Sequence, residues 1–203
     1  PNDPELEELL LPYYEAAVEQ AGQELGTLSG DWDQISDLVH YQSDTMDLLH
    51  ESRLWASGAE LSILSPQASQ GSCLGQLLDR QRSAPLTLRD CRALCPDRQD
   101  TLYVVGLTGS QLKDWLEECV KDRSAVWDQV YGVSYDAYLG NPEGQRVLNM
   151  TFEGRPITAD QVFRAAVSAS RLTGEGPWQS ITGISPDSPR VLWDAASSEQ
   201  FAA

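Results

Sequence analysis

The alternation of apolar and polar residues is clearest between residues 101 and 120. Residues 102–107 form a short apolar, β-branched run that ends at a Thr-Gly pair, which is typical of a buried strand entering a turn. Apolar side chains then recur at helical spacing opposite a charged face, namely Leu112, Trp115, Leu116, Cys119 and Val120. Thr108 and Gln111 fit a capping box, in which each side chain satisfies a backbone N–H. The pattern predicts an interior strand, a turn and an amphipathic helix over residues 110–120.

The first part of the chain carries two further helical patterns. Apolar residues recur at helical spacing over 4–25 with acidic residues opposite, so an amphipathic helix is predicted there, with Gly26 as its stop. Pro12 interrupts this pattern, and we expect it to kink the helix or to separate a first short turn. A second helix is predicted over 43–57, ended by Gly58, with Met46, Leu49 and Trp55 facing inward.

The remaining apolar runs predict strands, at residues 60–64, 129–138, 146–152 and 162–167. The second and third runs flank residues 140–144, which are rich in Gly, Asn and Pro, and this order is typical of a β-hairpin. A short helix is predicted over 87–94. Residues 174–177 are predicted to be a polar loop, and the chain is expected to fray after the last apolar cluster at 191–193.

Together these elements predict an α+β fold in which helices pack on a mixed β-sheet. A chain of 203 residues is long enough for one well-formed core. We therefore expect a leading helix, residues 1–26, followed by one domain, residues 27–203.

The charge balance limits the partners of this domain. The chain has 31 Asp and Glu residues against 14 Lys and Arg residues, a formal charge of −17, and its basic residues are scattered. Binding to a nucleic-acid polymer or an anionic membrane through broad electrostatic attraction is therefore disfavoured. No run of about 20 apolar residues predicts a membrane span. The chain begins at Pro1 without an initiator Met or a signal-like segment, so we expect it to be part of a longer protein.

Candidate catalytic chemistry is sparse. His40 and His50 have no acidic partners at metal-ligand spacing, so both are interpreted as ordinary imidazoles. The sequence contains no nucleophile motif, P-loop or dinucleotide-binding glycine motif. The four cysteines fit no zinc spacing and are interpreted mainly as buried thiols, with a disulfide as the alternative; they are Cys73, Cys91, Cys95 and Cys119. We expect neither catalytic residues nor a metal site in this chain.

Three segments carry a resemblance to a known family. Residues 100–117, DTLYVVGLTGSQLKDWLE, are similar throughout to the segment NTLxVVxLTGxQLKxWLE. Residues 131–156 resemble a GVxY hairpin with its Pro and Gly positions, and residues 166–176, AVSASRLTGEG, take the place of an ATNNYRASGGG loop. These are segments of the C-terminal domain of the 5′-nucleotidase family, and the chain is most similar to its branch of bifunctional 2′,3′-cyclic-nucleotide 2′-phosphodiesterase/3′-nucleotidases. The likeness spans about residues 40–180.

This resemblance implies a division of labour with another domain. In the family, an N-terminal metallophosphoesterase domain holds two divalent metal ions and performs the hydrolysis, a helix links the domains, and the C-terminal domain supplies the pocket for base and sugar. Residues 1–26 would then be the interdomain linker, and the metal ions would lie upstream, with no cofactor in this chain. The implied partners are that N-terminal domain and a nucleotide or another phosphorylated small molecule. The implied location is extracytoplasmic, whether secreted, periplasmic or associated with the cell wall.

The resemblance also identifies candidate substrate-binding residues in two loops. The family's two base-stacking aromatic residues correspond to Arg98 and Ser170, and its asparagines correspond to Asp100 and Ser168. The retained residues complete the candidate set, which is Arg98, Asp100, Ser168, Ser170, Arg171, Gly174 and Gly176. Two arginines without aromatic rings favour a phosphate or carboxylate over a neutral base.

Three functions are compatible with these observations. The first is a substrate-recognition domain of a nucleotidase or cyclic-nucleotide phosphodiesterase. The second is a degenerate, non-catalytic module that binds another phosphorylated ligand or serves domain assembly. The third, a catalytic site within this chain, has the least support, so we expect the chain alone to hydrolyse no phosphate ester.

Overall fold

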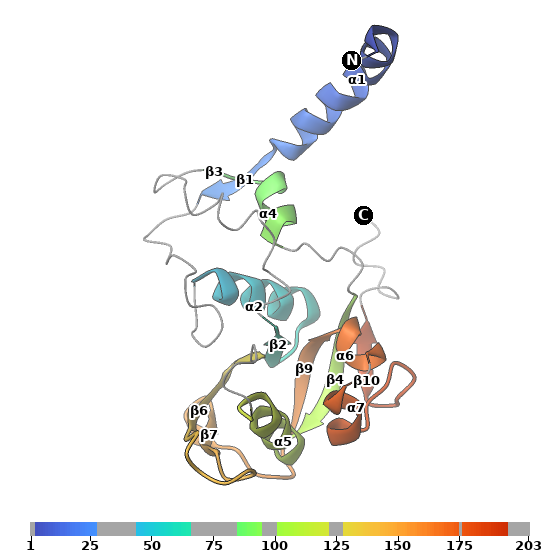
Figure 1. The fold of residues 1–203 in the computed structure, drawn as a ribbon. Coiled ribbons are helices and arrows are strands. Elements are labelled where there is room, and N and C mark those ends of the chain that lie inside the picture. Colours follow the sequence, from blue (N-terminus) through green and yellow to red (C-terminus); the bar gives the residue numbers. More distant parts are fainter. Residues whose placement is uncertain are drawn as a thin grey trace. The chain divides into compact units, whose positions relative to one another are not determined.

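The computed structural model describes residues 3–27, 44–65, 85–94, 101–121, 128–174 and 176–194 (Figure 1). These residues belong to two compact units, one built from residues 1–34 and 69–96 and the other from residues 35–68 and 97–203. The expected division into residues 1–26 and 27–203 stays a prediction. Among the helices of the described residues, none combines the length and the apolar character needed to cross a membrane.

The described residues of the smaller unit form two helices and a two-stranded sheet. Its elements are α1 (Pro4–Ala21), β1 (Glu24–Thr27), β3 (Pro85–Thr87) and α4 (Leu88–Leu94). The predicted continuation of the first helix to residue 25 is wrong, because Glu24 to Thr27 pair antiparallel with β3 instead. The N–H of Leu88 also donates to the carbonyl of Gln23 at 2.9 Å. The first helix continues across Pro12, and its large apolar side chains are more than half exposed.

The larger unit is organised on a five-stranded mixed sheet with strand order β10-β4-β9-β2-β5. The strands are β2 (Leu61–Leu64), β4 (Leu102–Thr108), β5 (Gln129–Tyr131), β9 (Val162–Ser168) and β10 (Val191–Asp194). The central strands β4 and β9 pair antiparallel in continuous register from Leu102↔Ser168 to Thr108↔Val162. Strand β2 runs parallel to β9, which confirms a mixed sheet. The last apolar cluster, residues 191–193, lies in β10 and pairs with β4. The residues after β10, where fraying was predicted, lie outside the described part of the chain.

Both faces of the central strands are buried over most of their length, although Val162 and Arg164 near the start of β9 are exposed. Val105, Ala165 and Val167 belong to one apolar cluster with the helix α5 (Gly109–Cys119). Val104 and Ala166, also buried, occupy the alternate positions and therefore face the other side, where α2 (Asp44–Ser57) packs. Burial on both faces explains why the strands read as continuous apolar runs.

The turn into α5 has the predicted capping box. Gln111 donates its backbone N–H to Thr108 Oγ1 at 3.2 Å, and Thr108 donates its N–H to Gln111 Oε1 at 3.1 Å. Gly109 is required here, because a Cβ at this position would lie 2.2 Å from the carbonyl oxygen of Thr158. Leu112, Trp115 and Leu116 are buried, so the predicted strand, turn and amphipathic helix are confirmed.

The prediction for α2 is confirmed for Met46 and Leu49 and is wrong for Trp55. Met46 and Leu49 are buried, whereas Trp55 is 87% exposed. Trp55 lies nine residues after Met46, which at about 3.6 residues per turn is two and a half turns, so it points to the opposite side of the helix. Gly58 follows the last helical residue, as predicted.

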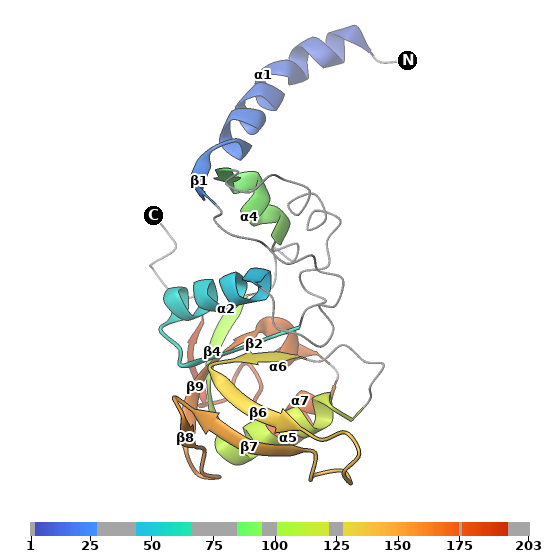
Figure 2. The same cartoon turned by 90° about the vertical axis from the view of Figure 1, so that its left-hand side faces the viewer.

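The second apolar run, residues 129–138, forms two strands rather than one. Gly132 separates β5 from β6 (Val133–Ala137) with a φ of 97°, and a Cβ there would lie 2.9 Å from the carbonyl oxygen of Glu60. Strand β6 pairs with β7 (Val147–Phe152), which continues through a tight turn into β8 (Arg155–Pro156). Strands β6, β7 and β8 together form a second sheet of the larger unit (Figure 2). The predicted hairpin is therefore confirmed, but its first strand begins at Val133 and not at residue 129.

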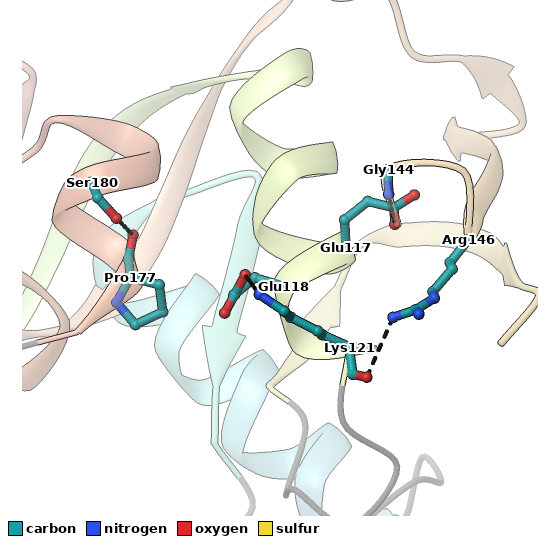
Figure 3. Close-up of polar contacts among 7 residues, drawn as sticks. All are labelled: Glu117, Glu118, Lys121, Gly144, Arg146, Pro177 and Ser180. Atoms are coloured by element: carbon teal, nitrogen blue, oxygen red, sulfur yellow. Dashed lines mark hydrogen bonds and ion pairs between the residues drawn. The ribbon is translucent and has the colours of Figure 1, made fainter. Parts of the chain in front are cut away.

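The hairpin is attached to α5 by polar contacts. Glu117 accepts hydrogen bonds from the N–H groups of Gly144 at 3.0 Å and Val147 at 2.7 Å. Arg146 donates to the carbonyl oxygen of Lys121 at 3.3 Å, and Lys121 forms an ion pair with Glu118 (Figure 3). One carboxylate on the central helix thus orders the backbone of the hairpin loop.

Two short helices that were not predicted follow β9, one on each side of the polar loop predicted at residues 174–177. They are α6 (Ala169–Thr173) and α7 (Pro177–Thr182). Leu172 and Trp178 are their buried side chains. Helices of five and six residues are too short for helical periodicity to be recognised in the sequence.

The two tryptophans in α5 and α2 give a matched test of this packing. Trp115 is 4% exposed and Trp55 is 87% exposed. We expect Trp115→Ala to lower the free energy of unfolding by about 3–5 kcal/mol, because it removes a large buried side chain. Trp55→Ala should change it by about 0.5 kcal/mol or less. Urea unfolding of both variants measures the difference, and equal losses would contradict the assignment of buried and exposed faces.

Candidate functional site

Polar side chains gather at one end of the strands of the larger sheet, which is called the site edge. Strands β2 and β9 end at this edge, and the antiparallel strands β4 and β5 begin there. The N–H of Ala169 donates to the carbonyl of Thr101 at 2.8 Å, which joins the segment after β9 to the segment before β4. Four side chains that interact at this edge are called the strand-end cluster, namely Arg53, Asp128, Ser168 and Arg171.

The described part of the predicted site lies at this edge. Ser168 is the last residue of β9, and Ser170 and Arg171 lie on α6. Gly174 follows α6 and donates its N–H to the carbonyl of Ser170 at 2.9 Å, while Gly176 precedes α7 in an extended conformation. Ser170, Gly174 and Gly176 are exposed. The other two predicted contacts, Arg98 and Asp100, lie outside the described residues.

Arg171 is held on two sides by the protein. Its Nη2 forms an ion pair with Asp128 Oδ1, and its guanidinium carbon lies 5.5 Å from the ring centroid of Trp115. The side chain of Asp128 is 3% exposed and that of Arg171 is 31% exposed. Arg171 is therefore oriented by internal contacts while part of its side chain remains open to solvent.

Burial dominates the electrostatics of Asp128. It raises the pKa of this carboxyl above its ordinary value, and the positive charges of Arg171 and Arg53 oppose that rise. The indole N–H of Trp115 faces the same carboxylate. Asp128 Oδ2 and Trp115 Nε1 nevertheless fail to meet hydrogen-bond geometry, so this is a polar contact and not a hydrogen bond.

Arg53 is a site residue that sequence reasoning missed. It lies on α2 and donates to Ser168 Oγ and to the carbonyl oxygen of Ile63, both at 3.2 Å. A signal was present, because Arg53 follows Met46 and Leu49 on the same face of the helix. A charged residue on a buried face needs polar partners, and such residues gather at functional sites.

His50 is a buried imidazole beside this cluster. It is 1% exposed, its Nδ1 lies 2.9 Å from Ser62 Oγ, and its ring stacks on Tyr131 with centroids 5.5 Å apart. Burial, with a smaller contribution from the charge of Arg53, lowers the pKa of His50 from 6.5 to about 3. The ring is therefore neutral at physiological pH, as expected for an ordinary core imidazole.

No metal centre can be assembled from the part of the chain that the structure describes. Within it, no group of three or more His, Cys, Asp or Glu side chains could hold an ion. Cys91 and Cys119 are free thiols, and burial raises the pKa of Cys119 to about 12, so it stays protonated. Cys73, Cys95 and His40 lie outside the described residues.

Comparisons with known proteins agree on the family. The sequence profile of the family described as 5′-nucleotidase, C-terminal domain, matches residues 25–182. A 2′,3′-cyclic-nucleotide 2′-phosphodiesterase/3′-nucleotidase of Haemophilus influenzae is 27% identical over 243 aligned positions, which cover 94% of this chain and 36% of the relative. The chain thus spans about a third of the length of this relative.

Two solved structures share the fold. A Staphylococcus aureus protein assigned as a 5′-nucleotidase superposes with a TM-score of 0.70 at 19% identity, over 96% of this chain and 38% of its own. A 5′-nucleotidase precursor from Thermus thermophilus superposes with a TM-score of 0.67 at 20% identity, over 89% of this chain and 36% of its own. At these identities the likeness shows the fold, and it confirms the predicted α+β class.

The depressed pKa of His50 predicts a pH-dependent stability. Between pH 6.5 and about 3 the unfolded chain binds a proton at this residue and the folded chain does not. The stability that the neutral ring contributes is therefore present above pH 6.5 and is lost as the pH falls toward 3. In this window the His50→Asn variant should lose stability with falling pH more slowly than the natural protein, by about 1.4 kcal/mol per pH unit.

Urea unfolding at pH 7, 6, 5 and 4 measures the two slopes, with the variant's own value at pH 7 as the baseline. Parallel slopes for the two proteins would show that His50 takes up its proton equally in both states.

Proposed function

Because the chain belongs to the family of 5′-nucleotidase C-terminal domains, we propose that it is the substrate-recognition part of a phosphoric ester hydrolase that acts on nucleotides or cyclic nucleotides. The observation that carries this proposal is the segment after β9, which leaves the sheet where four strands meet. The half-buried Arg53 and the buried Asp128 hold this segment, while Ser170, Gly174 and Gly176 stay exposed. Exposed polar residues on a rigid frame are the usual construction of a binding site.

The charges at this site favour an anionic ligand. The chain carries a formal charge of −17, so positive potential must come from local groups. Arg53 and Arg171 both lie close enough to Asp128 to oppose the rise of its pKa, although their side chains come from different helices. A guanidinium has five N–H donors, and charge-assisted bonds to phosphate oxygens are among the strong hydrogen bonds of proteins. The phosphate is therefore the group that we propose this site recognises.

The hydrolytic step belongs, in this proposal, to a metallophosphoesterase domain that precedes these residues in the protein. Its two divalent metal ions would activate the attacking water and stabilise the developing charge on the phosphate. Support comes from the length of the Haemophilus relative, of which this chain covers 36%, and from the activity in its name. The role of this chain would be to bind and orient the nucleotide, with the leading helix as interdomain linker.

The name of the Thermus neighbour supports a proposed location. That protein is named a precursor. We propose that the present protein acts outside the cytoplasm, on nucleotides that it meets there.

A second candidate function is a module that has kept the fold and lost nucleotide recognition. The observation in its favour is that Ser168 and Ser170 take the places of an asparagine and a stacking aromatic residue. The side chain of Ser168 is moreover engaged by Arg53. A module of this kind would bind phosphorylated molecules without preference for the base.

Kinetics of the protein at its full natural length test the first function. The substrates are AMP, 3′-AMP, 2′,3′-cyclic AMP and ribose 5-phosphate. Arg171→Ala should raise KM for the nucleotides by about tenfold to a hundredfold, because one charge-assisted contact is lost, and should leave kcat within about threefold. Arg155→Ala, an exposed arginine on β8, is the matched control and should leave both constants unchanged.

An unchanged KM in the Arg171→Ala variant would contradict its role in binding. Equal kcat/KM for ribose 5-phosphate and the nucleotides would favour the second function. Absence of hydrolysis of all four substrates by an intact, metal-loaded protein would contradict the first.

A further inference from the structure

The segment after β9 is held at two points on either side of its exposed glycines. Before Gly174, Arg171 lies with its guanidinium carbon 5.5 Å from the ring centroid of Trp115. After Gly176, Trp178 packs edge-to-face on the same ring, with centroids 4.9 Å apart and an interplanar angle of 78°. Trp115 thus contacts both flanks of the segment and is itself fixed in the core on α5.

The two flanks are also joined directly. Gln179 on α7 donates its side-chain amide to the carbonyl oxygen of Leu172 on α6 at 2.6 Å. Leu172 and Trp178 are both buried. Helices α6 and α7 are therefore joined to each other and packed against α5, and the exposed glycines lie between them.

Asp128 is the group whose presence packing alone does not explain. Its side chain is 3% exposed, and of its two oxygens Oδ1 pairs with Arg171 while Oδ2 has no hydrogen-bond partner among the described residues. Removing a carboxylate from water is costly, and a buried ion pair is often no more stable than apolar residues of the same shape. A buried, incompletely satisfied carboxylate is therefore poorly suited to stabilise the fold and well suited to orient its partner.

The position of Asp128 fits this role. It directly precedes β5, which pairs with β2, whereas Arg171 follows β9, which pairs with β2 on the other side. The ion pair consequently connects α6, which follows β9, to the start of β5, and β2 lies between these two strands in the sheet. It sets the direction of the guanidinium against the face of Trp115.

We propose that Asp128 and Trp115 are positioning residues for recognition of the substrate phosphate, and that they act by fixing the guanidinium of Arg171 between them. The inference rests on the proposed function, in which Arg171 contacts an anionic ligand. Asp128 and Trp115 themselves are buried and do not touch the substrate. Their contribution is to hold the long Arg171 side chain in one orientation before the ligand arrives, so that binding loses less conformational freedom.

The decisive variant is Asp128→Asn in the protein at its full natural length, because it keeps the shape of the side chain and removes its charge. We expect KM for the nucleotide substrates to rise about tenfold, with kcat within about threefold of the natural protein. The matched control is Asp187→Asn, which removes an exposed carboxylate of the same unit and should change neither constant.

A double-mutant cycle separates positioning from general damage. Asp128→Asn should have no further effect on KM in an Arg171→Ala background, because it acts through Arg171. Additive effects of the two substitutions would overturn the proposal. The proposal would also be overturned if Arg171→Ala raised KM but Asp128→Asn left KM at its natural value. That result would leave the proposed function intact, because Arg171 would still contact the ligand.

A second measurement does not depend on activity. The Nε–H signal of Arg171 in a proton–nitrogen NMR spectrum should be distinct in the natural protein and should be lost to exchange or shifted to the position of free arginine in Asp128→Asn. Asp187→Asn should leave it unchanged. An Arg171 signal that is unaffected by Asp128→Asn would overturn the positioning role, whatever the activity of the protein. Absence of phosphate-ester hydrolysis, by contrast, would contradict the proposed function.

Discussion

The pairing of β4 with β9, buried on both faces, is the constraint on which the larger unit depends. Seven consecutive residue pairs join the strands, and helices cover the sheet on both sides. A polar side chain within the buried stretch of β9, residues 165–167, would lose its water without gaining a partner, whereas Arg164 earlier in the strand is exposed. The polar side chains of Ser168, Arg171 and Asp128 lie at the end of the sheet beyond that stretch.

The ion pair between Asp128 and Arg171 is not an arrangement that favours the free energy of folding. The side chain of Asp128 is 3% exposed and that of Arg171 is 31% exposed. Their ion pair compensates only part of the hydration free energy that Asp128 loses on burial. The raised pKa of Asp128 reports the same imbalance, since burial outweighs the two nearby arginines. The neighbouring His50 is a contrast, because its neutral ring satisfies Ser62 and stacks on Tyr131 with no buried charge.

The negative charge of the chain makes the two arginines near Asp128 more important for any attraction of an anion. With a formal charge of −17, this part of the protein repels anions at a distance, so an anionic ligand would be attracted only within about 10 Å, where nearby charges are not screened by salt. Arg53 and Arg171 lie on helices that are far apart in sequence, and both act on the same carboxylate.

The sequence alone determined the features that depend on neighbouring residues. Strand β4, its capped turn and α5 could be predicted because strand and helix periods and the capping box of Thr108 and Gln111 extend over a few positions. The family likeness was visible for the same reason, since its clearest segment is this continuous stretch. Arg98 and Asp100 stay predictions of that likeness.

Only the tertiary structure decided what depends on residues far apart in the chain. Arg53 meets Ser168 across 115 positions and Arg171 meets Asp128 across 43, and no local pattern encodes either contact. The division of residues 129–138 at Gly132 followed from the close approach of Glu60, and the strand at Glu24–Thr27 required β3 as its partner. Periodicity shows which face of an element is apolar, but the identity of the partner that covers that face is a property of the packed chain.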